Sequence, residues 1–108
     1  MITDTDLFYD TSFFYSSLFG HKITIAYKRS RDRGLVVFGA AFCSTHDRFM
    51  KSMGRNIAEG RLECRPQTIL IDAGMTRFDM HHIILMSVRT LPYAPTSLSD
   101  FSVEETGY

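Results

Sequence analysis

The sequence lacks the features that mark several special classes of protein. It has no tryptophan, three prolines and two cysteines in 108 residues, and 12 basic residues balance 12 acidic ones. Two cysteines are too few for a disulfide-stapled miniprotein, and the few glycines and prolines do not fit a collagen-like chain. A hydrophobic content of 44% with balanced charge excludes a wholly disordered chain.

Long apolar runs and a basic N-terminus are also missing. Apolar runs such as Ile83–Met86 are far shorter than the ~20 residues that span a membrane. Residues 1–10 hold acids and no base, which does not fit a secretory signal. We therefore expect a cytoplasmic protein with reduced thiols and no membrane contact. We expect one domain over residues 1–95 and a polar, mobile tail over residues 96–108.

Charge is unevenly distributed along the chain. Between Lys22 and Arg65 there are ten basic and four acidic residues, so this stretch carries +6, and residues 1–21 and 66–108 each carry −3. Either the acidic ends fold over the basic middle, or the middle forms a surface for a nucleic acid or an acidic protein. In the second case the expected partner-binding residues are Arg29, Arg31, Arg33, Arg48, Lys51, Arg55 and Arg61.

Three segments have strand patterns. Ile23–Tyr27 alternates apolar and smaller residues, and Leu35–Phe42 is β-branched and aromatic. The polar stretch Ser30–Gly34 between them predicts a β-hairpin with a five-residue loop. Gly39 predicts close packing or a bulge in the second strand, and Thr68–Ile71 predicts a third strand.

An amphipathic helix is expected over Thr45–Glu59. Ser44 or Thr45 is its predicted N-cap and Gly60 its predicted end. Gly54 and Ala58 permit close approach of another element. The residues expected to face the sheet form one apolar arc, namely Phe49, Met50, Met53 and Ile57.

Two segments allow more than one interpretation. Asp6–Phe19 fits a short helix ending at Gly20, or an irregular aromatic-rich arm. Thr76 and Asp79 have the spacing of a helix cap, yet His82–Val88 is apolar and β-branched. We favour a strand for His82–Val88, because a fourth strand would complete a sheet for the predicted helix to cover.

The predicted fold class is α+β, with a small, mainly antiparallel sheet, one amphipathic helix packed on it and a short N-terminal helix. Such a sheet leaves a face or an edge uncovered, and five tyrosines with nine phenylalanines exceed what one small core easily hides. We therefore expect a homodimer. Its candidate contact residues are Phe13, Phe14 and Tyr15.

Residue types suited to metal binding or catalysis are present without a specific spacing. The candidate metal ligands are Cys43, His46, Cys64, His81 and His82. They include no Cys-x-x-Cys or His-x₃-His pair, so we expect no metal. Cys43, His82 and Asp72 are the types that a cysteine nucleophile needs, but spacing does not show that they meet. We expect no catalytic residue, no cofactor and no enzymatic activity, with a small enzyme or metalloprotein around Cys43 and the histidines as the weakest alternative.

Two neighbouring motifs carry a resemblance. They are Ala41-Phe42-Cys43-Ser44-x-x-Asp47-x-Phe49 and Gly54-Arg55-x-Ile57-Ala58-x-Gly60-Arg61-Leu62. Together they resemble a pattern in small phage open reading frames, where a strand runs into a capped helix. The resemblance implies a phage accessory protein that binds a host protein or ribonucleoprotein complex. Inhibition of a host defence or nucleic-acid-processing complex, as by the anti-CRISPR proteins, is the function that it implies. The alternative is a nucleic-acid-binding regulator that uses the basic hairpin loop and the helix.

Overall fold

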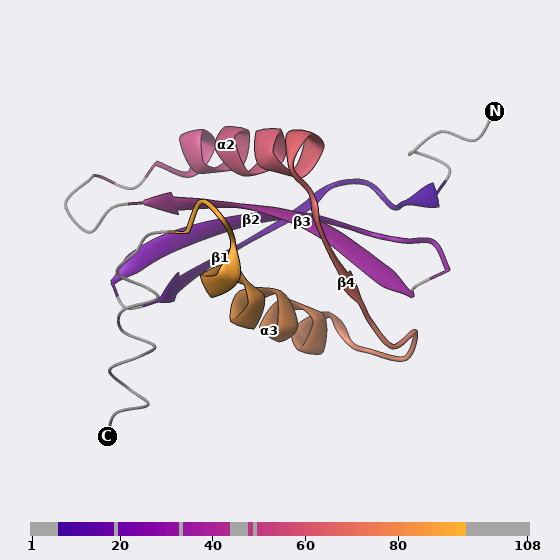
Figure 1. The fold of residues 1–108 in the computed structure, drawn as a ribbon. Coiled ribbons are helices and arrows are strands. Elements are labelled where there is room, and N and C mark those ends of the chain that lie inside the picture. Colours follow the sequence, from indigo (N-terminus) through magenta and orange to yellow (C-terminus); the bar gives the residue numbers. More distant parts are fainter. Residues whose placement is uncertain (1–6, 19, 33, 44–47, 49, 95–108) are drawn as a thin grey trace, which may run out of the picture.

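A four-stranded antiparallel sheet with one helix on each face forms the protein (Figure 1). The computed structural model describes residues 7–18, 20–32, 34–43, 48 and 50–94. Within these ranges no helix has the length and apolar character needed to cross a membrane. The strands lie side by side in chain order and the α+β class is confirmed. In sequence, the elements are β1 (Ser12–Leu18), β2 (His21–Arg29), β3 (Leu35–Cys43), α2 (Lys51–Cys64), β4 (Gln67–Leu70), α3 (Arg77–Ser87) and the 3₁₀ helix η1 (Val88–Thr90).

The predicted hairpin of β2 and β3 is confirmed, together with its five-residue loop. Ser30 begins the loop and is hydrogen-bonded to Leu35 through main-chain and side-chain atoms. The Asp32 carboxylate accepts hydrogen bonds from the Ser30 hydroxyl at 2.6 Å and from the Gly34 N–H at 2.9 Å. These two bonds hold the pKa of Asp32 below its ordinary value. Asp32 therefore shapes the loop as an Asx turn.

The predicted N-terminal helix is wrong over Ser12–Leu18, which is strand β1. Its residues pair with β2 from Ser12 opposite Tyr27 to Leu18 opposite His21. Gly20 has a φ of 84° in the tight connection to β2, a conformation that glycine adopts without strain. The aromatic run is compatible with a strand because successive side chains point to opposite faces, and both faces of this sheet are covered.

The favoured strand over His82–Val88 is also wrong, and the helical alternative is correct. Thr76 and Asp79 form a reciprocal capping box at the start of α3. The Asp79 N–H donates to Thr76 Oγ1, and Asp79 Oδ2 accepts from the Thr76 N–H. This cap satisfies main-chain N–H groups that a helix start would leave without partners. Segment 76–88 therefore covers the sheet and does not extend it.

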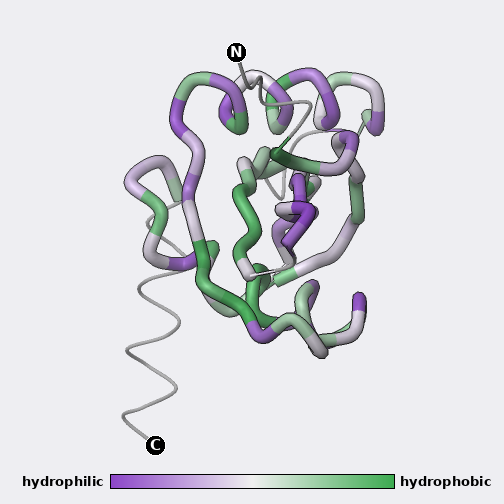
Figure 2. Tube along the Cα trace, turned by 90° about the vertical axis from the view of Figure 1, so that its right-hand side faces the viewer, coloured by the Kyte–Doolittle hydropathy of each residue, from purple (hydrophilic) through white to green (hydrophobic). Residues whose placement is uncertain are grey.

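The main core lies between the sheet and α3. Figure 2 shows hydrophobic stretches in the central strands, whereas the helix at the top, α2, alternates between hydrophilic and hydrophobic residues. The sheet contributes side chains from β2 and β3 to this core, and α3 and η1 cover them. Its fully buried large residues are Ile23, Ile25, Val36, Phe38, Ile84 and Val88.

The second core, between α2 and the opposite face of the sheet, is small and depends on Gly39. A Cβ at this position would lie within 3 Å of Ala58 O and Arg61 C in the α2 backbone, so the helix rests directly on the strand. Ala58 and Leu62 are the buried side chains of α2. The prediction that Gly39 and Ala58 mark close packing is confirmed.

Three details of the predicted helix need correction. It begins at Lys51 with Met50 as a cap that makes no side-chain hydrogen bond, whereas the predicted cap at residues 44–45 lies outside the described residues. It continues through Gly60 to Cys64. The apolar arc does not face the core: Met50, Met53 and Ile57 are 52%, 56% and 42% exposed. Phe49 lies outside the described residues.

Two side chains close the edge of β3 where β4 ends. Strand β4 pairs with β3 as far as Gln67 opposite Phe38, so Ala40 pairs with β2 on one side and has no strand partner on the β4 side. Arg61 Nη1 donates to the Ala40 carbonyl oxygen at 2.8 Å, and the Ala40 N–H donates to the Tyr93 hydroxyl at 3.1 Å. The Arg61 guanidinium also lies 4.2 Å from the centre of the Tyr93 ring. We call Ala40, Arg61 and Tyr93 the edge latch.

The contact at Gly39 gives a first prediction. Gly39→Ala should lower the free energy of unfolding by about 1–3 kcal/mol, because the new methyl group must push the helix backbone away. Gly60→Ala is the matched control on α2, since a Cβ there meets nothing within 4 Å. It should stabilise the protein by up to ~1 kcal/mol through its higher helix propensity. Urea unfolding of both variants measures the contrast, and equal stabilities would contradict the close contact.

The edge latch gives a second prediction. Tyr93→Phe should cost about 1–3 kcal/mol, because the buried Ala40 N–H loses its acceptor. Tyr9→Phe, at an exposed tyrosine, should change stability by less than ~0.5 kcal/mol. Thermal or urea unfolding compares the two variants. A Tyr93→Phe protein as stable as Tyr9→Phe would show that the latch does not close the strand edge.

Candidate functional site

Two of the seven predicted partner-binding residues serve the fold. The guanidinium of Arg29 donates to the main-chain oxygens of Met75 at 3.2 Å, Ala73 at 3.3 Å and Asp72 at 3.4 Å. It thereby holds the connection between β4 and α3 against the end of β2. Arg61 belongs to the edge latch. Both arginines are only partly exposed, so their positive charges are directed to main-chain oxygens within the protein.

The other predicted residues separate into two groups. Arg31 is in the hairpin loop, where its guanidinium lies 4.9 Å from the centre of the Tyr9 ring, and Arg33 lies outside the described residues. Arg48, Lys51 and Arg55 belong to the segment that leads into α2 and to its first turns. The hairpin loop and the start of α2 lie at opposite ends of the sheet (Figure 1). The structure therefore does not bring the two groups into one surface.

The basic residues near the start of α2 gather around Tyr15. Lys51 Nζ lies 4.9 Å from the centre of the Tyr15 ring, and Arg55 Nη1 donates to the Tyr15 hydroxyl at 3.1 Å. Tyr15 stands opposite Thr24 on the α2 face of β1. Arg48, Lys51 and Arg55 are all exposed, so a partner can reach their charges.

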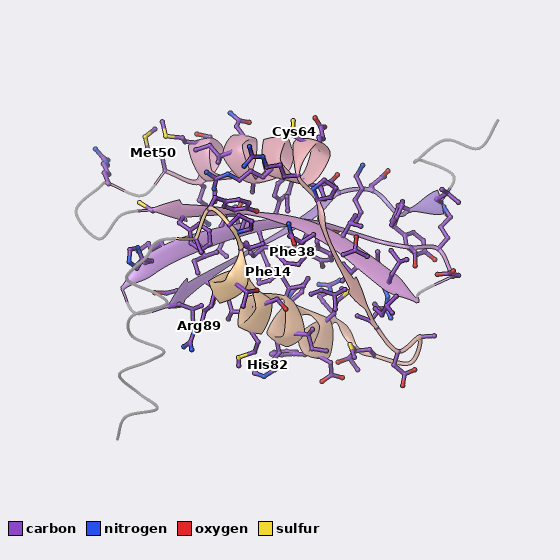
Figure 3. All side chains as sticks on the ribbon, in the orientation of Figure 1. Phe14, Phe38, Met50, Cys64, His82 and Arg89 are labelled. Carbon is purple, nitrogen blue, oxygen red and sulfur yellow. The ribbon has the colours of Figure 1, made fainter. Side chains whose placement is uncertain are left out.

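A groove of about 430 Å³ lies between the first half of α2 and the sheet, and Arg48 is the one of these three cations that lines it. Met50, Met53 and Ile57 are its apolar residues from α2 and its approach, and Ala41 and Cys43 come from β3. Figure 3 shows Met50 at the start of α2 and Cys64 at its other end. We call this cavity the α2 groove; Lys22, Thr24, Phe42, Arg48 and Gly54 complete its lining.

Sequence reasoning found the residues of the α2 groove but gave them another role. The apolar arc on this helix was expected to form the core, and the arginines beside it to form the site. The small residues that the helix packs with, Gly39 and Ala58, were the available signal that the closest contact lies on another side of the helix. Once that contact is made, the methionines border a groove.

The aromatic residues predicted as dimer contacts are used at least partly within the chain. Phe14 stacks on His81 with ring centres 4.0 Å apart and meets Tyr27 edge-on at 5.8 Å. Phe13 packs on the opposite face against the small core of α2. Tyr15 lies beside Lys51 and Arg55. The homodimer stays a prediction, but Phe13 and Phe14 already have intramolecular partners.

The candidate nucleophile and its helpers lie apart. Cys43 lines the α2 groove, whereas His82 is exposed on α3, where its side chain points away from the sheet (Figure 3). Asp72 is in the connection after β4, where its carboxylate accepts from the Gly74 N–H at 3.2 Å. Because the sheet separates α2 from α3, these three residues do not form one site. In the described part of the chain, no three His, Cys, Asp or Glu residues come together to hold a metal ion.

His81 is a half-buried titratable group on α3. Its Nε2 atom shares a hydrogen bond of 2.8 Å with the Tyr27 hydroxyl, and its ring is stacked on Phe14. Burial, with a smaller contribution from the charge of Arg77, lowers the pKa of His81 below its ordinary value of 6.5. The folded protein therefore favours the neutral imidazole.

A pH dependence of stability follows from this pKa. As pH falls below about 6.5, the unfolded chain binds a proton at His81 before the folded protein does, so the free energy of unfolding should decrease. Above that pH the contribution of His81 should be constant. His81→Gln keeps a polar group near Tyr27 without titrating. Urea unfolding between about pH 7.5 and 5 measures the free energy of unfolding of wild type and of His81→Gln. The difference between the two free energies should become smaller at low pH, and a difference that stays constant would contradict the assignment.

Comparison with known proteins assigns no role to this surface. No protein-family model, curated protein or solved structure matches the chain. The resemblance to phage open reading frames remains an expectation from two motifs. The geometry of the α2 groove and its cations is therefore the basis for the function proposed next.

Proposed function

We propose that the chain is a non-enzymatic binding protein whose α2 groove takes an acidic protein segment with apolar side chains. One observation carries the proposal: Met50, Met53 and Ile57 are each more than two-fifths exposed and line a groove whose lining also includes Lys22 and Arg48. Methionine side chains are flexible and polarizable, so they adapt to apolar side chains of different shapes. Basic residues beside the groove attract an acidic partner and orient it.

An acidic protein fits this surface better than a nucleic acid does. The cations of the hairpin loop lie at the far end of the sheet, so they do not extend the track that Arg48, Lys51 and Arg55 would offer a phosphate backbone (Figure 1). The ring of Tyr15 is next to Lys51 and its hydroxyl accepts from Arg55, which leaves it poorly placed to stack on a base. Apolar methionine and isoleucine side chains instead suit the interior of a protein interface.

The phage resemblance supports a more specific version of this proposal. A stoichiometric binding protein can inhibit a host defence or nucleic-acid-processing complex by covering an acidic surface that the complex needs. Such complexes offer acidic grooves, and arginine forks bind carboxylates in a bidentate manner. This version adds three points to the general proposal, namely a host complex as the partner, its inhibition as the result of binding, and the cytoplasm as the place of action.

Reversal of two charges tests the proposal. Arg48→Glu with Arg55→Glu should reduce the captured partner roughly tenfold, because each exposed charged contact contributes up to ~1 kcal/mol. The matched control is Arg65→Glu with Arg77→Glu, which makes the same change in net charge at exposed sites that neither line the α2 groove nor contact Tyr15. Quantitative affinity purification from a lysate of the organism in which the chain occurs compares the three proteins.

Two further arms of this experiment separate the alternatives. Nuclease treatment of the lysate should leave the capture unchanged if the partner is a protein, whereas loss of capture would favour the nucleic-acid-binding alternative. Raising the salt concentration should narrow the gap between wild type and the Arg48/Arg55 variant, because exposed charges are screened. Equal capture by both double variants would overturn the role of this surface.

A further inference from the structure

We propose that, in the free protein, the α2 groove is occupied by the chain's own segment 95–108, which a partner must displace. The inference deepens the proposed function, because it assigns the same groove a regulatory occupant. It combines three independent observations. These are the place where the described chain ends, the chemistry of the residues that follow, and the lining of the groove.

The edge latch fixes the starting point of the segment. The Ala40 N–H donates to the Tyr93 hydroxyl, and the Tyr93 ring meets Phe42 edge-on with centres 6.1 Å apart. Phe42 and the next residue, Cys43, are part of the α2 groove lining. Ala94 packs against the main core. The described chain therefore ends at the β3 edge on the α3 side of the sheet, and the segment that follows must pass this edge to reach the α2 groove.

The composition of segment 95–108 complements the α2 groove. The segment contains three acids and no base, and its apolar residues are spaced between them. The groove has an apolar wall of two methionines and an isoleucine, with Lys22 and Arg48 also in its lining. Apolar side chains can cover the methionines while the carboxylates lie near the cations. The apolar residues in question are Leu98, Phe101 and Val103, and the acids are Asp100, Glu104 and Glu105.

The length of the segment sets how far it can extend from Ala94. An extended chain spans about 3.3–3.6 Å per residue, so Leu98 can lie up to ~14 Å and Phe101 up to ~25 Å from Ala94. Short tethers give effective concentrations in the millimolar range. A segment that binds with a dissociation constant of ~1 mM as a free peptide would therefore fill the groove in half to nine-tenths of the molecules. Weak contacts suffice because the segment is tethered.

The two native cysteines provide the test in the full chain. Cys43 lines the α2 groove, whereas Cys64 is exposed at the other end of α2 and serves as an internal reference (Figure 3). Alkylation by iodoacetamide, resolved by peptide mass spectrometry, gives the rate at each thiol. Phe101→Ser should raise the rate at Cys43 roughly two- to tenfold and leave Cys64 unchanged, in line with the expected occupancy. Phe101→Leu keeps an apolar anchor and should retain the protection.

Charge and concentration separate the possible occupants. Neutralising the acids with Asp100→Asn, Glu104→Gln and Glu105→Gln should also speed alkylation of Cys43, and 1 M salt should do the same to wild type. Protection that grows with protein concentration would overturn the proposal and show that a second copy fills the groove. Equal Cys43 rates in wild type and Phe101→Ser would overturn it as well. Because no partner is present, these outcomes are independent of the capture experiment that tests the proposed function.

Discussion

The absence of a side chain at Gly39 is the constraint on which the functional surface depends. The α2 backbone lies where a Cβ would be, so the strand fixes both the height and the rotation of the helix. Ala58 and Leu62 then point inward, and the larger apolar residues of the same helix are directed to the α2 groove. A helix held by a small contact near its C-terminal half thus presents methionines beside cations without losing its place on the sheet.

The sequence predicted the centre of the sheet correctly and exchanged the roles of two outer segments. The β2–β3 hairpin is predicted from two local features, namely the alternation of residue types along its strands and the polar loop between them. These features are sufficient to predict the hairpin because the packing of neighbouring elements does not change its local structure. The pattern of segment 76–88 fits a strand or a helix, and that of the aromatic segment 12–18 fits a helix or an irregular arm, so neither pattern settles the local structure. Which one joins the sheet is decided by non-local pairing with β2. Once β1 supplies the fourth strand, the capping box at Thr76 directs the later segment into a helix.

The candidate site was predictable in composition but not in geometry. A cluster of basic residues is visible in the sequence, yet the role of each arginine depends on the main-chain oxygens near it. Arg29 and Arg61 lie beside carbonyl groups that lack strand partners, and both guanidinium groups bind there. Arg48 and Arg55 lie on an exposed part of the chain and keep their charges accessible. Only the fold distinguishes the arginines that bind main-chain oxygens from those whose charges stay exposed.

The edge latch also has a consequence for the order in which the protein is made. Tyr93 follows all four strands of the described sheet, so during synthesis the β3 edge at Ala40 cannot be closed until residue 93 has left the ribosome. Until then the nascent sheet has an open main-chain edge, the kind of surface at which chains associate with one another. A ribosome that pauses shortly before this point would prolong the time during which this main-chain edge is open.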